Sequence, residues 1–171
     1  TPIAESLIDI KTIFTGTIWP TVLTQTKKQS TFIIFLTDGD DTCATETTTG
    51  SGDNLALRSA HKAELLYSRF VAAEPTSSVT TFVVALGTGV SANRANWIAW
   101  GGSGMRNPDA AGVTQAGPAL SGAANLSSTR WNTIPTAAMR TACTTCRDAF
   151  LASDAASLSE AIQAAIDLGQ T

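Results

Sequence analysis

The chain has 171 residues, of which 43% are hydrophobic, and its formal net charge is −3. This length and composition suffice for one ordinary hydrophobic core, so we expect a single domain or part of one. The longest basic run is Lys27-Lys28, which argues against a nucleic-acid-binding surface. No apolar stretch approaches the ~20 residues that a membrane-spanning helix needs.

The first half of the chain predicts a helix, a strand and a longer helix. Apolar residues at helical spacing indicate the first helix over about residues 2–14. Residues 31–37, Thr-Phe-Ile-Ile-Phe-Leu-Thr, are typical of a central strand that is covered on both faces in a parallel sheet. A loop rich in Thr, Gly and Ser follows, after which Asp53 can cap a helix that continues to about residue 73. The predicted buried side of this helix consists of Leu55, Leu57, Ala60, Leu65, Leu66, Phe70 and Val71.

A second strand and a short helix follow. Residues 79–86 predict a strand, and their apolar second half indicates burial on both faces. Residues 87–89, Gly-Thr-Gly, turn the chain into a helix over residues 91–100, which Gly101-Gly102 is expected to end. The Gly-x-Gly-x-x-Ala spacing that starts at Gly87 also occurs in dinucleotide-binding sites. Because no acid-bearing strand follows it, we interpret it as a tight turn.

The last third of the chain contains its least regular segment. Residues 103–142 show little periodicity and many Gly, Pro, Asn and Ser residues, which predicts an irregular surface insertion. Beyond it we expect a strand at about residues 149–152 and, after Ser153-Asp154, a final helix. The apolar side of that helix consists of Leu158, Ile162, Ala165, Ile166 and Leu168. Helices and strands therefore alternate, which predicts an α/β fold with a parallel sheet.

The most informative motif is the acidic turn Asp38-Gly39-Asp40-Asp41, which directly follows strand 31–37. Open α/β sheets bind ligands at the carboxyl ends of their strands, because loops on a rigid support line the crevice there. Carboxylate oxygens are the ligands that hard cations such as Mg²⁺ prefer. The turn is therefore a candidate cation site.

Two other interpretations of this turn are weaker. Asp38 and Asp40 match the Asp-x-Asp-x-Thr motif of haloacid-dehalogenase-like phosphatases, in which they would be nucleophile and general acid of a Mg²⁺-dependent enzyme. Such enzymes also need a downstream Lys, and no Lys follows Lys62. An EF-hand loop starting at Asp38 fails, because Cys43 stands where Gly is required and Thr49 where Glu is required. The phosphatase remains the alternative function.

Four segments, in chain order, resemble the von Willebrand factor type A (vWA) family. Residues 1–7, Thr-Pro-Ile-Ala-Glu-Ser-Leu, resemble the segment in which that family's metal-site Thr opens a helix. Residues 36–39, Leu-Thr-Asp-Gly, resemble the end of its fourth strand, and residues 82–102 resemble the fifth strand and the next helix. Residues 151–166 resemble the closing strand and helix. In detail, the first two segments look like the vWA region of PilY-type adhesins at bacterial type IV pilus tips.

The resemblance implies a Rossmann-like, three-layer fold with a metal-ion-dependent adhesion site. Thr1 and Asp38 would be ligands of Mg²⁺, or of Ca²⁺ or Mn²⁺ in its place, with Asp40 and Asp41 as further candidates. An open position on the ion would accept a carboxylate from a partner, which is recognition and not catalysis. We therefore expect a non-enzymatic adhesion module, secreted and exposed on a bacterial surface or pilus tip. Its ligand would be a host or surface protein, and pilin subunits are further candidate partners.

The chain departs from the family at its beginning. The family's Asp-x-Ser-x-Ser motif, which follows the first strand, occurs nowhere in the sequence. We therefore expect residues 1–171 to be the C-terminal portion of a vWA domain that begins upstream. One edge of strand 31–37 would then lack its neighbour. The rest of the same polypeptide, or another chain, would supply the missing strand and metal ligands. A structural scaffold with a non-functional metal site is a third alternative.

Three cysteines are present, Cys43, Cys143 and Cys146. The Cys-Thr-Thr-Cys spacing of the last two occurs in redox dithiols and in half zinc sites, but the chain has no second Cys or His pair at zinc spacing. A structural disulfide formed in an oxidising compartment is the favoured interpretation. The sequence leaves three pairings open, and the odd cysteine is a candidate for pairing with a segment outside this chain.

Four single residues have ordinary explanations as well as functional ones. His61 lies on the long helix without a matching His or Cys, so we expect it on the surface. Trp97 and Trp100 are three positions apart on a short helix, which favours packing over a carbohydrate platform. Trp131, in the insertion, is the better candidate for contact with a partner.

Overall fold

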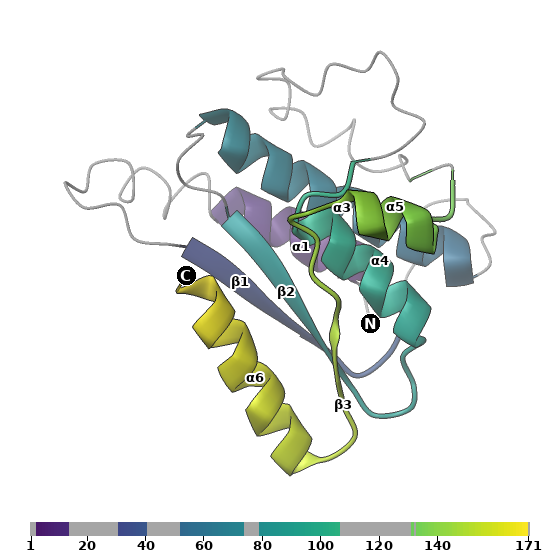
Figure 1. The fold of residues 1–171 in the computed structure, drawn as a ribbon, viewed down its shortest axis with the longest axis vertical. Coiled ribbons are helices and arrows are strands. Elements are labelled where there is room, and N and C mark those ends of the chain that lie inside the picture. The colour runs from purple at the N-terminus through teal and green to yellow at the C-terminus, as the bar shows by residue number, and fades with distance from the viewer. Residues whose placement is uncertain are drawn as a thin grey trace.

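The computed structural model describes residues 3–13, 31–40, 52–73, 79–106, 131 and 133–170. Figure 1 shows its elements, which are α1 (Ile3–Ile13), β1 (Thr31–Thr37), α3 (Gly52–Ala73), β2 (Val79–Leu86), α4 (Ala92–Gly102), α5 (Ala137–Ala142), β3 (Phe150–Ala152) and α6 (Ala155–Gly169). The predicted order of helices and strands is confirmed. The exception is α5, a short helix inside the segment for which we expected no regular structure.

The three described strands form one parallel sheet in the order β1-β2-β3. Thr31 pairs with Val79 at one end of the β1–β2 register and Thr37 with Ala85 at the other. The short β3 pairs with the carboxyl end of β2, from Val84 to Leu86. This confirms an α/β fold with a parallel sheet. Within the described residues β2 is the central strand, and β1 is an edge strand whose other side carries no described partner.

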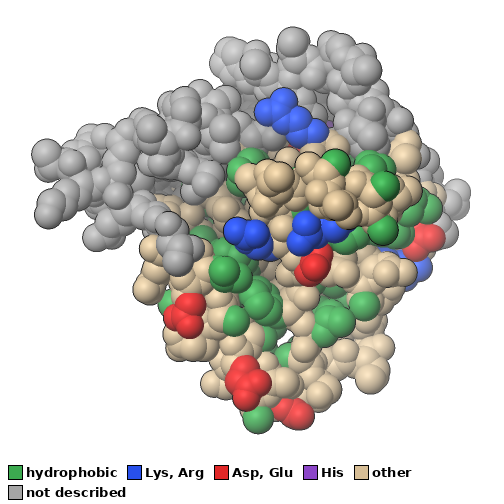
Figure 2. Space-filling model, viewed as in Figure 1, with side chains coloured by type: hydrophobic (Ala, Val, Ile, Leu, Met, Phe, Trp, Pro, Cys, Tyr) green, Lys and Arg blue, Asp and Glu red, His purple; other side chains and the backbone are tan. Residues whose placement is uncertain are grey.

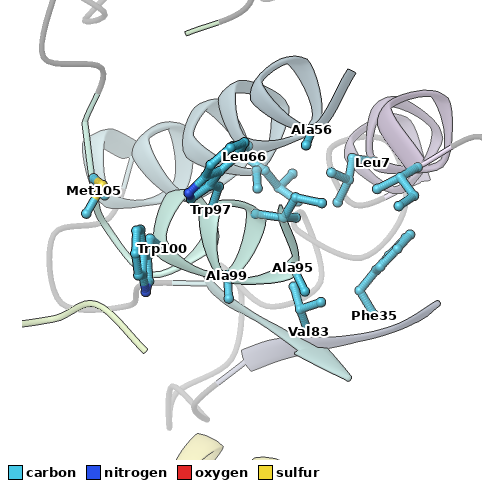
Figure 3. Packing of buried hydrophobic residues seen from close by; sticks show 14 of the residues in the cluster. Leu7, Phe35, Ala56, Leu66, Val83, Ala95, Trp97, Ala99, Trp100 and Met105 are labelled. Atoms are coloured by element: carbon cyan, nitrogen blue, oxygen red, sulfur yellow. The ribbon is translucent and has the colours of Figure 1, made fainter. Parts of the chain in front are cut away.

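Helices cover both faces of this sheet. Figure 1 shows α6 on one face and α1, α3 and α4 on the other. The core lies under the second group, where side chains from α1, α3, α4, β1 and β2 interdigitate (Figure 3). The final helix begins as predicted, because Asp154 and Ser157 form a capping box at its N-terminus.

The expectation that β1 is covered on both faces is wrong. Ile33 and Phe35 are buried under the helices, but Leu36, which points to the opposite face, is 50% exposed. On that face Phe32, Phe82 and Phe150 form a row of edge-on and tilted ring contacts across the sheet. Of the described helices, α6 alone lies on this face and covers the row only in part. Figure 2 shows apolar side chains at the surface there. For β2 the expectation is confirmed, because residues 81–85 are buried on both sides.

The glycine pair at the end of α4 has a packing function that the sequence did not reveal. The helix α4 ends at this pair as predicted, and both glycines are its last helical residues and are buried. A Cβ at Gly101 would collide with the carbonyl oxygen of Ala60, and one at Gly102 would lie 2.7 Å from the Thr81 side chain. The two glycines therefore let α4 approach the backbone of α3 and of β2.

The buried side of α3 is wider than predicted. Leu57, Ala60 and Leu66 are buried as expected, whereas Leu55 and Leu65 are half-buried. The side chains of Phe70 and Val71 lie outside the described residues. Polar side chains are buried too, and these are Arg58, Ser59, His61, Lys62 and Glu64. The reason is that α3 packs against both α1 and α4, so it has no broad solvent-facing side along this stretch.

Candidate functional site at the carboxyl edge of the sheet

The acidic turn lies where the parallel topology predicted, at the carboxyl end of β1. The hydroxyl of Thr37, the last residue of the strand, donates a hydrogen bond of 2.7 Å to the carbonyl oxygen of Gly39, which closes a tight turn. Asp38 lies between them and is exposed. The turn after β2 touches this one, because a Cβ built on Gly89 would lie 3.0 Å from the Asp38 carbonyl oxygen. The turns that follow β1 and β2 therefore lie side by side at this edge of the sheet.

Asp40 has a different environment from Asp38. Its Oδ1 accepts a hydrogen bond of 3.1 Å from the backbone N–H of Ser91, the N-cap residue of α4. Its Oδ2 is paired with the guanidinium group of Arg94. The same guanidinium donates from Nε to Oδ1 of Asp53, in the first turn of α3, at 2.9 Å. We call Asp40, Arg94 and Asp53 the outer ion network. It joins the β1 turn to the N-terminal ends of two helices.

The charges of this network explain its arrangement. Arg94 lies in the first turn of α4, where the helix dipole disfavours a cation, whereas a carboxylate such as Asp40 is favoured there. The hydrogen bond to Asp53 and then the one to Asp40 raise the pKa of Arg94 above its ordinary value, against the opposing effect of burial. Two carboxylates therefore stabilise a guanidinium at a helix end that would otherwise disfavour it.

The expected role of Asp53 as a helix cap is wrong, because α3 begins at Gly52 and the Asp53 side chain binds Arg94. Gly52 also matters here, since a Cβ at this position would lie 2.5 Å from Nη1 of Arg94. Sequence reasoning missed Arg94 altogether. The available signal was a basic residue in the first turn of a helix, a position that implies a carboxylate partner.

The structure places only part of the predicted cation site. Thr1 and Asp41 lie outside the described residues, as does Cys43. In the described ranges no group of three or more His, Cys, Asp or Glu side chains is placed to hold a metal ion. Asp38 fits one ligand position for a hard cation, because it is an exposed carboxylate at a strand end. Asp40 does not fit, because both of its oxygens are engaged by Ser91 and Arg94.

A second group of polar side chains is buried where Trp131, in the predicted insertion, packs against α3. The indole N–H of Trp131 donates a hydrogen bond of 2.7 Å to Oε2 of Glu64, and Nδ1 of His61 is 3.3 Å from the same oxygen. The backbone N–H of Trp131 also donates to the carbonyl oxygen of Leu57 at 3.3 Å. We call Trp131, Glu64 and His61 the inner polar cluster. The expectation that His61 lies at the surface is wrong, because its side chain is buried. Trp131, the predicted candidate for contact with a partner, is fully buried too.

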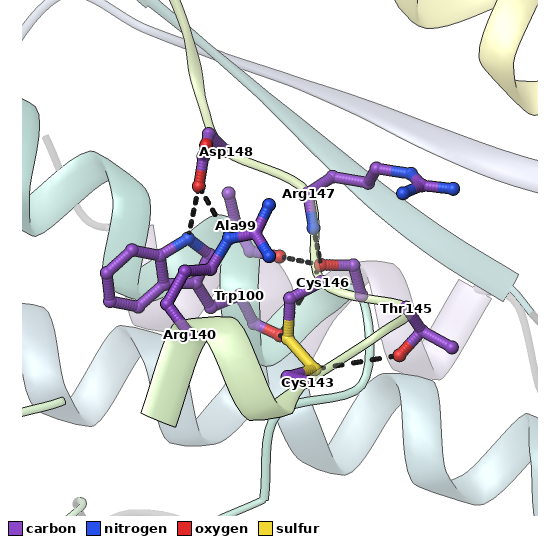
Figure 4. The surroundings of a disulfide bond; sticks show 9 residues. Ala99, Trp100, Arg140, Cys143, Thr145, Cys146, Arg147 and Asp148 are labelled. Carbon is purple, nitrogen blue, oxygen red and sulfur yellow. Dashed lines mark hydrogen bonds and ion pairs between the residues drawn. A yellow bond between two sulfur atoms is a disulfide. The ribbon is translucent and has the colours of Figure 1, made fainter. Parts of the chain in front are cut away.

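Cys143 and Cys146 form a disulfide, which was the favoured of the sequence interpretations (Figure 4). Cys143 follows α5, and Cys146 is fully buried against α4, with its sulfur 3.7 Å from the carbonyl oxygen of Trp100. This position at the C-terminal end of a helix differs from that of a redox dithiol at a helix N-terminus. The bond therefore lies in a packed connection between α5 and β3.

Hydrogen bonds on both sides of the disulfide fix this connection to α4. Asp148 accepts from the indole N–H of Trp100 at 2.7 Å and from Nε of Arg140 at 2.8 Å (Figure 4). These two hydrogen bonds, first that of Arg140 and then that of Trp100, lower the pKa of Asp148. The hydroxyl of Ser103 accepts from the backbone N–H of Arg147 at 2.8 Å. The buried indoles of Trp97 and Trp100 confirm the expected packing role.

No protein-family model matches this chain, and no curated protein or solved structure does either. Of the helices that the structure describes, none is both long enough and apolar enough to cross a membrane. The functional argument therefore depends on the geometry of the carboxyl edge and on the chemistry of its side chains.

Proposed function

We propose that this chain is part of a metal-dependent adhesion module with a vWA-like fold, secreted and exposed on a bacterial surface, at the tip of a type IV pilus. The observation that carries the proposal is the position of Asp38. It is an exposed carboxylate at the carboxyl end of a parallel strand, with the turn after the neighbouring strand packed against its backbone. Such an edge is where α/β sheets bind ligands.

In this proposal Asp38 holds a divalent cation, with Thr1 as a second ligand and the remaining ligands from a segment that pairs with β1. A bound Mg²⁺, Ca²⁺ or Mn²⁺ would offer a Lewis-acidic position to a carboxylate of the partner protein. The parallel order β1-β2-β3 and the edge position of β1 among the described strands support this arrangement. A strand added beside β1 would place its own carboxyl end next to Asp38.

The phosphatase alternative draws less support from the geometry. It requires Asp40 as a general acid, which must carry a proton that it can donate to a leaving group. The Asp40 carboxylate instead accepts one hydrogen bond from Ser91 and is paired with Arg94. Both oxygens are therefore engaged by donors of the fold, so this carboxylate is poorly placed to reach a leaving group.

The test is a cation titration of the full chain, followed site by site through the carboxyl and backbone signals in NMR spectra. We expect Mg²⁺ to shift the signals of Asp38, with a dissociation constant on the order of 1–10 mM in the absence of the other ligands. Asp38→Asn should remove the response while leaving the circular dichroism spectrum unchanged. No Asp38-dependent response would refute the proposal.

A parallel assay separates adhesion from catalysis. Hydrolysis of p-nitrophenyl phosphate in the presence of Mg²⁺, abolished by Asp38→Asn, would show that the chain is an enzyme and refute the adhesion proposal. The proposal expects no turnover above that of the Asp38→Asn control. A cation response without turnover supports recognition. If the chain shows neither a cation response nor turnover, the structural scaffold remains as the alternative.

A further inference from the structure

The disulfide joins two cysteines whose sulfur atoms differ in their access to solvent. Cys143, the C-cap residue of α5, is half-buried and is followed by two exposed threonines, whereas Cys146 is fully buried against α4 (Figure 4). We propose that this bond is a thiol-sensitive latch for α5, which an external thiol opens by attack at Cys143. The inference goes beyond the proposed function and does not depend on a bound cation.

The chain beyond Cys146 is attached to α4 by contacts that do not involve the disulfide. Residues 147–149 each form a hydrogen bond with a side chain of α4 or with that of its C-cap residue Ser103, over distances of 2.7–2.9 Å. The sulfur of Cys146 lies 3.7 Å from the carbonyl oxygen of Trp100, so a reduced Cys146 can donate its S–H to this oxygen. Opening the bond should therefore leave this part of the chain in place.

The six residues of α5 have no comparable attachment. None of their side chains is fully buried, and α5 does not pack extensively on any other described element. Met139 is partly buried against the core, and Nε of Arg140 donates to Oδ1 of Asp148, whose side chain is 59% exposed. So exposed an ion pair contributes little to stability, and a helix of six residues is too short to be stable alone. The disulfide is therefore the main restraint on the position of α5.

The latch opens by thiol–disulfide exchange. The sulfur of an external thiolate attacks Sγ of Cys143, the S–S bond breaks, and its electron pair leaves on Sγ of Cys146, which takes up a proton from water. A second thiolate then attacks the external sulfur of this mixed disulfide and releases Cys143, so that two thiols are oxidised to one disulfide while both cysteines are reduced. Burial excludes attack at Cys146 itself. Once the bond is open, Thr144 and Thr145 form a flexible link that lets α5 move relative to α4.

The first experiment compares backbone hydrogen exchange before and after reduction with dithiothreitol, in the full chain and in Cys43→Ser, which removes the third thiol. The N–H groups of Arg140 and Cys143 report on α5, because each donates to a carbonyl oxygen one turn earlier. Their exchange should accelerate by at least about tenfold on reduction. The N–H groups of Arg147, bound to α4, and of Leu158, in α6, are the controls and should change by less than about twofold. Unchanged exchange in α5, or equal acceleration at Arg147, would overturn the inference.

The second experiment identifies the sulfur that is attacked. In the Cys43→Ser background, Cys146→Ser leaves only the thiol of Cys143, and the matched variant Cys143→Ser leaves only that of Cys146. A chromogenic disulfide reagent should react at least about 100-fold faster with the first variant in native buffer, and at similar rates with both in denaturing urea. Equal rates in native buffer would contradict the assignment.

The same assignment can be tested without a change at either cysteine of the bond. Cys43→Ser is treated with glutathione, quenched with acid during partial reduction, and digested for mass spectrometry. The mixed disulfide should lie on Cys143, because its sulfur is the accessible one. Glutathione found on Cys146 would overturn the proposed direction of attack.

Discussion

The outer ion network and the inner polar cluster use similar chemistry at different depths. In the first, Arg94 bridges two carboxylates at the rim of the sheet, with side chains that are 19–45% exposed. In the second, the fully buried Glu64 accepts from the indole of Trp131. Water can replace a lost partner at the rim but not in the interior, so equal hydrogen bonds contribute unequally to stability. The inner polar cluster should therefore contribute more to the stability of the fold than the outer ion network does.

Removing the buried donor should have the largest effect. Trp131→Phe takes away the N–H that Glu64 accepts and leaves a small cavity, so we expect the free energy of unfolding to fall by about 3 kcal/mol. Urea denaturation measures this. The matched control is Trp97→Phe, which shrinks another buried indole but keeps the hydrogen bond to Glu64. If both variants lost the same stability, the hydrogen bond would contribute nothing beyond packing.

The disulfide between Cys143 and Cys146 should make the second largest contribution to stability. Replacing both cysteines, as in Cys143→Ser/Cys146→Ser, should lower the free energy of unfolding by about 2 kcal/mol, the value expected for so short a closed loop. The measurement is a thermal melt of both proteins in the absence of reductant. Adding a thiol reductant should lower the melting temperature of the unmodified chain towards that of the variant and leave the variant unchanged.

Removing one buried hydroxyl group should increase the stability of the fold. The Oγ1 atom of Thr81 on β2 is buried and has no hydrogen-bond partner among the described residues. Thr81→Val keeps the shape and removes the unsatisfied group, so the free energy of unfolding should rise by about 1 kcal/mol. Thr80→Val, on the opposite face of the same strand, is the control and should change stability little. A loss of stability in Thr81→Val would mean that the hydroxyl has a partner beyond the described residues.

The outer ion network should contribute less than the buried contacts. A double-mutant cycle of Asp40→Asn and Arg94→Gln, measured by urea denaturation with a chelator present, should give a coupling energy of about 0.5–1 kcal/mol. Because the pair is partly exposed, raising the salt concentration to about 1 M should reduce the coupling. A coupling as large as the effect of Trp131→Phe would contradict the contrast between rim and interior.

The smallest expected effect is the pH dependence of stability that Asp148 contributes. The pKa of Asp148 is lowered below its ordinary value of about 3.8, first by Arg140 and then by Trp100. A folded-state pKa below the unfolded one stabilises the protein above the unfolded value, and this stability is lost as the pH falls through the folded value. Since the side chain is 59% exposed, the contribution should stay below about 1 kcal/mol. The difference in melting temperature between the unmodified chain and Asp148→Asn should therefore shrink below pH 4.

Local pattern was sufficient to predict most elements of this fold. The apolar run at residues 31–37 and the capping residue Asp154 both lead to the observed elements, and alternation of helices and strands predicted the parallel sheet. These features depend on side chains that are near one another in sequence, where periodicity and capping act directly. The short helix α5 escaped notice because six residues carry too little periodicity to detect.

The sequence by itself determined most of the elements, the parallel sheet and the position of the acidic turn at a strand end. Only the tertiary structure decided how Asp38 and Asp40 differ in exposure, because the partners of Asp40 come from residues 51 and 54 positions away. The same holds for the burial of His61 and for Trp131, whose partner Glu64 is 67 positions away. Periodicity describes one helix or strand at a time. Contacts between distant elements depend on how the faces pack, and that packing gives chemically similar residues different roles.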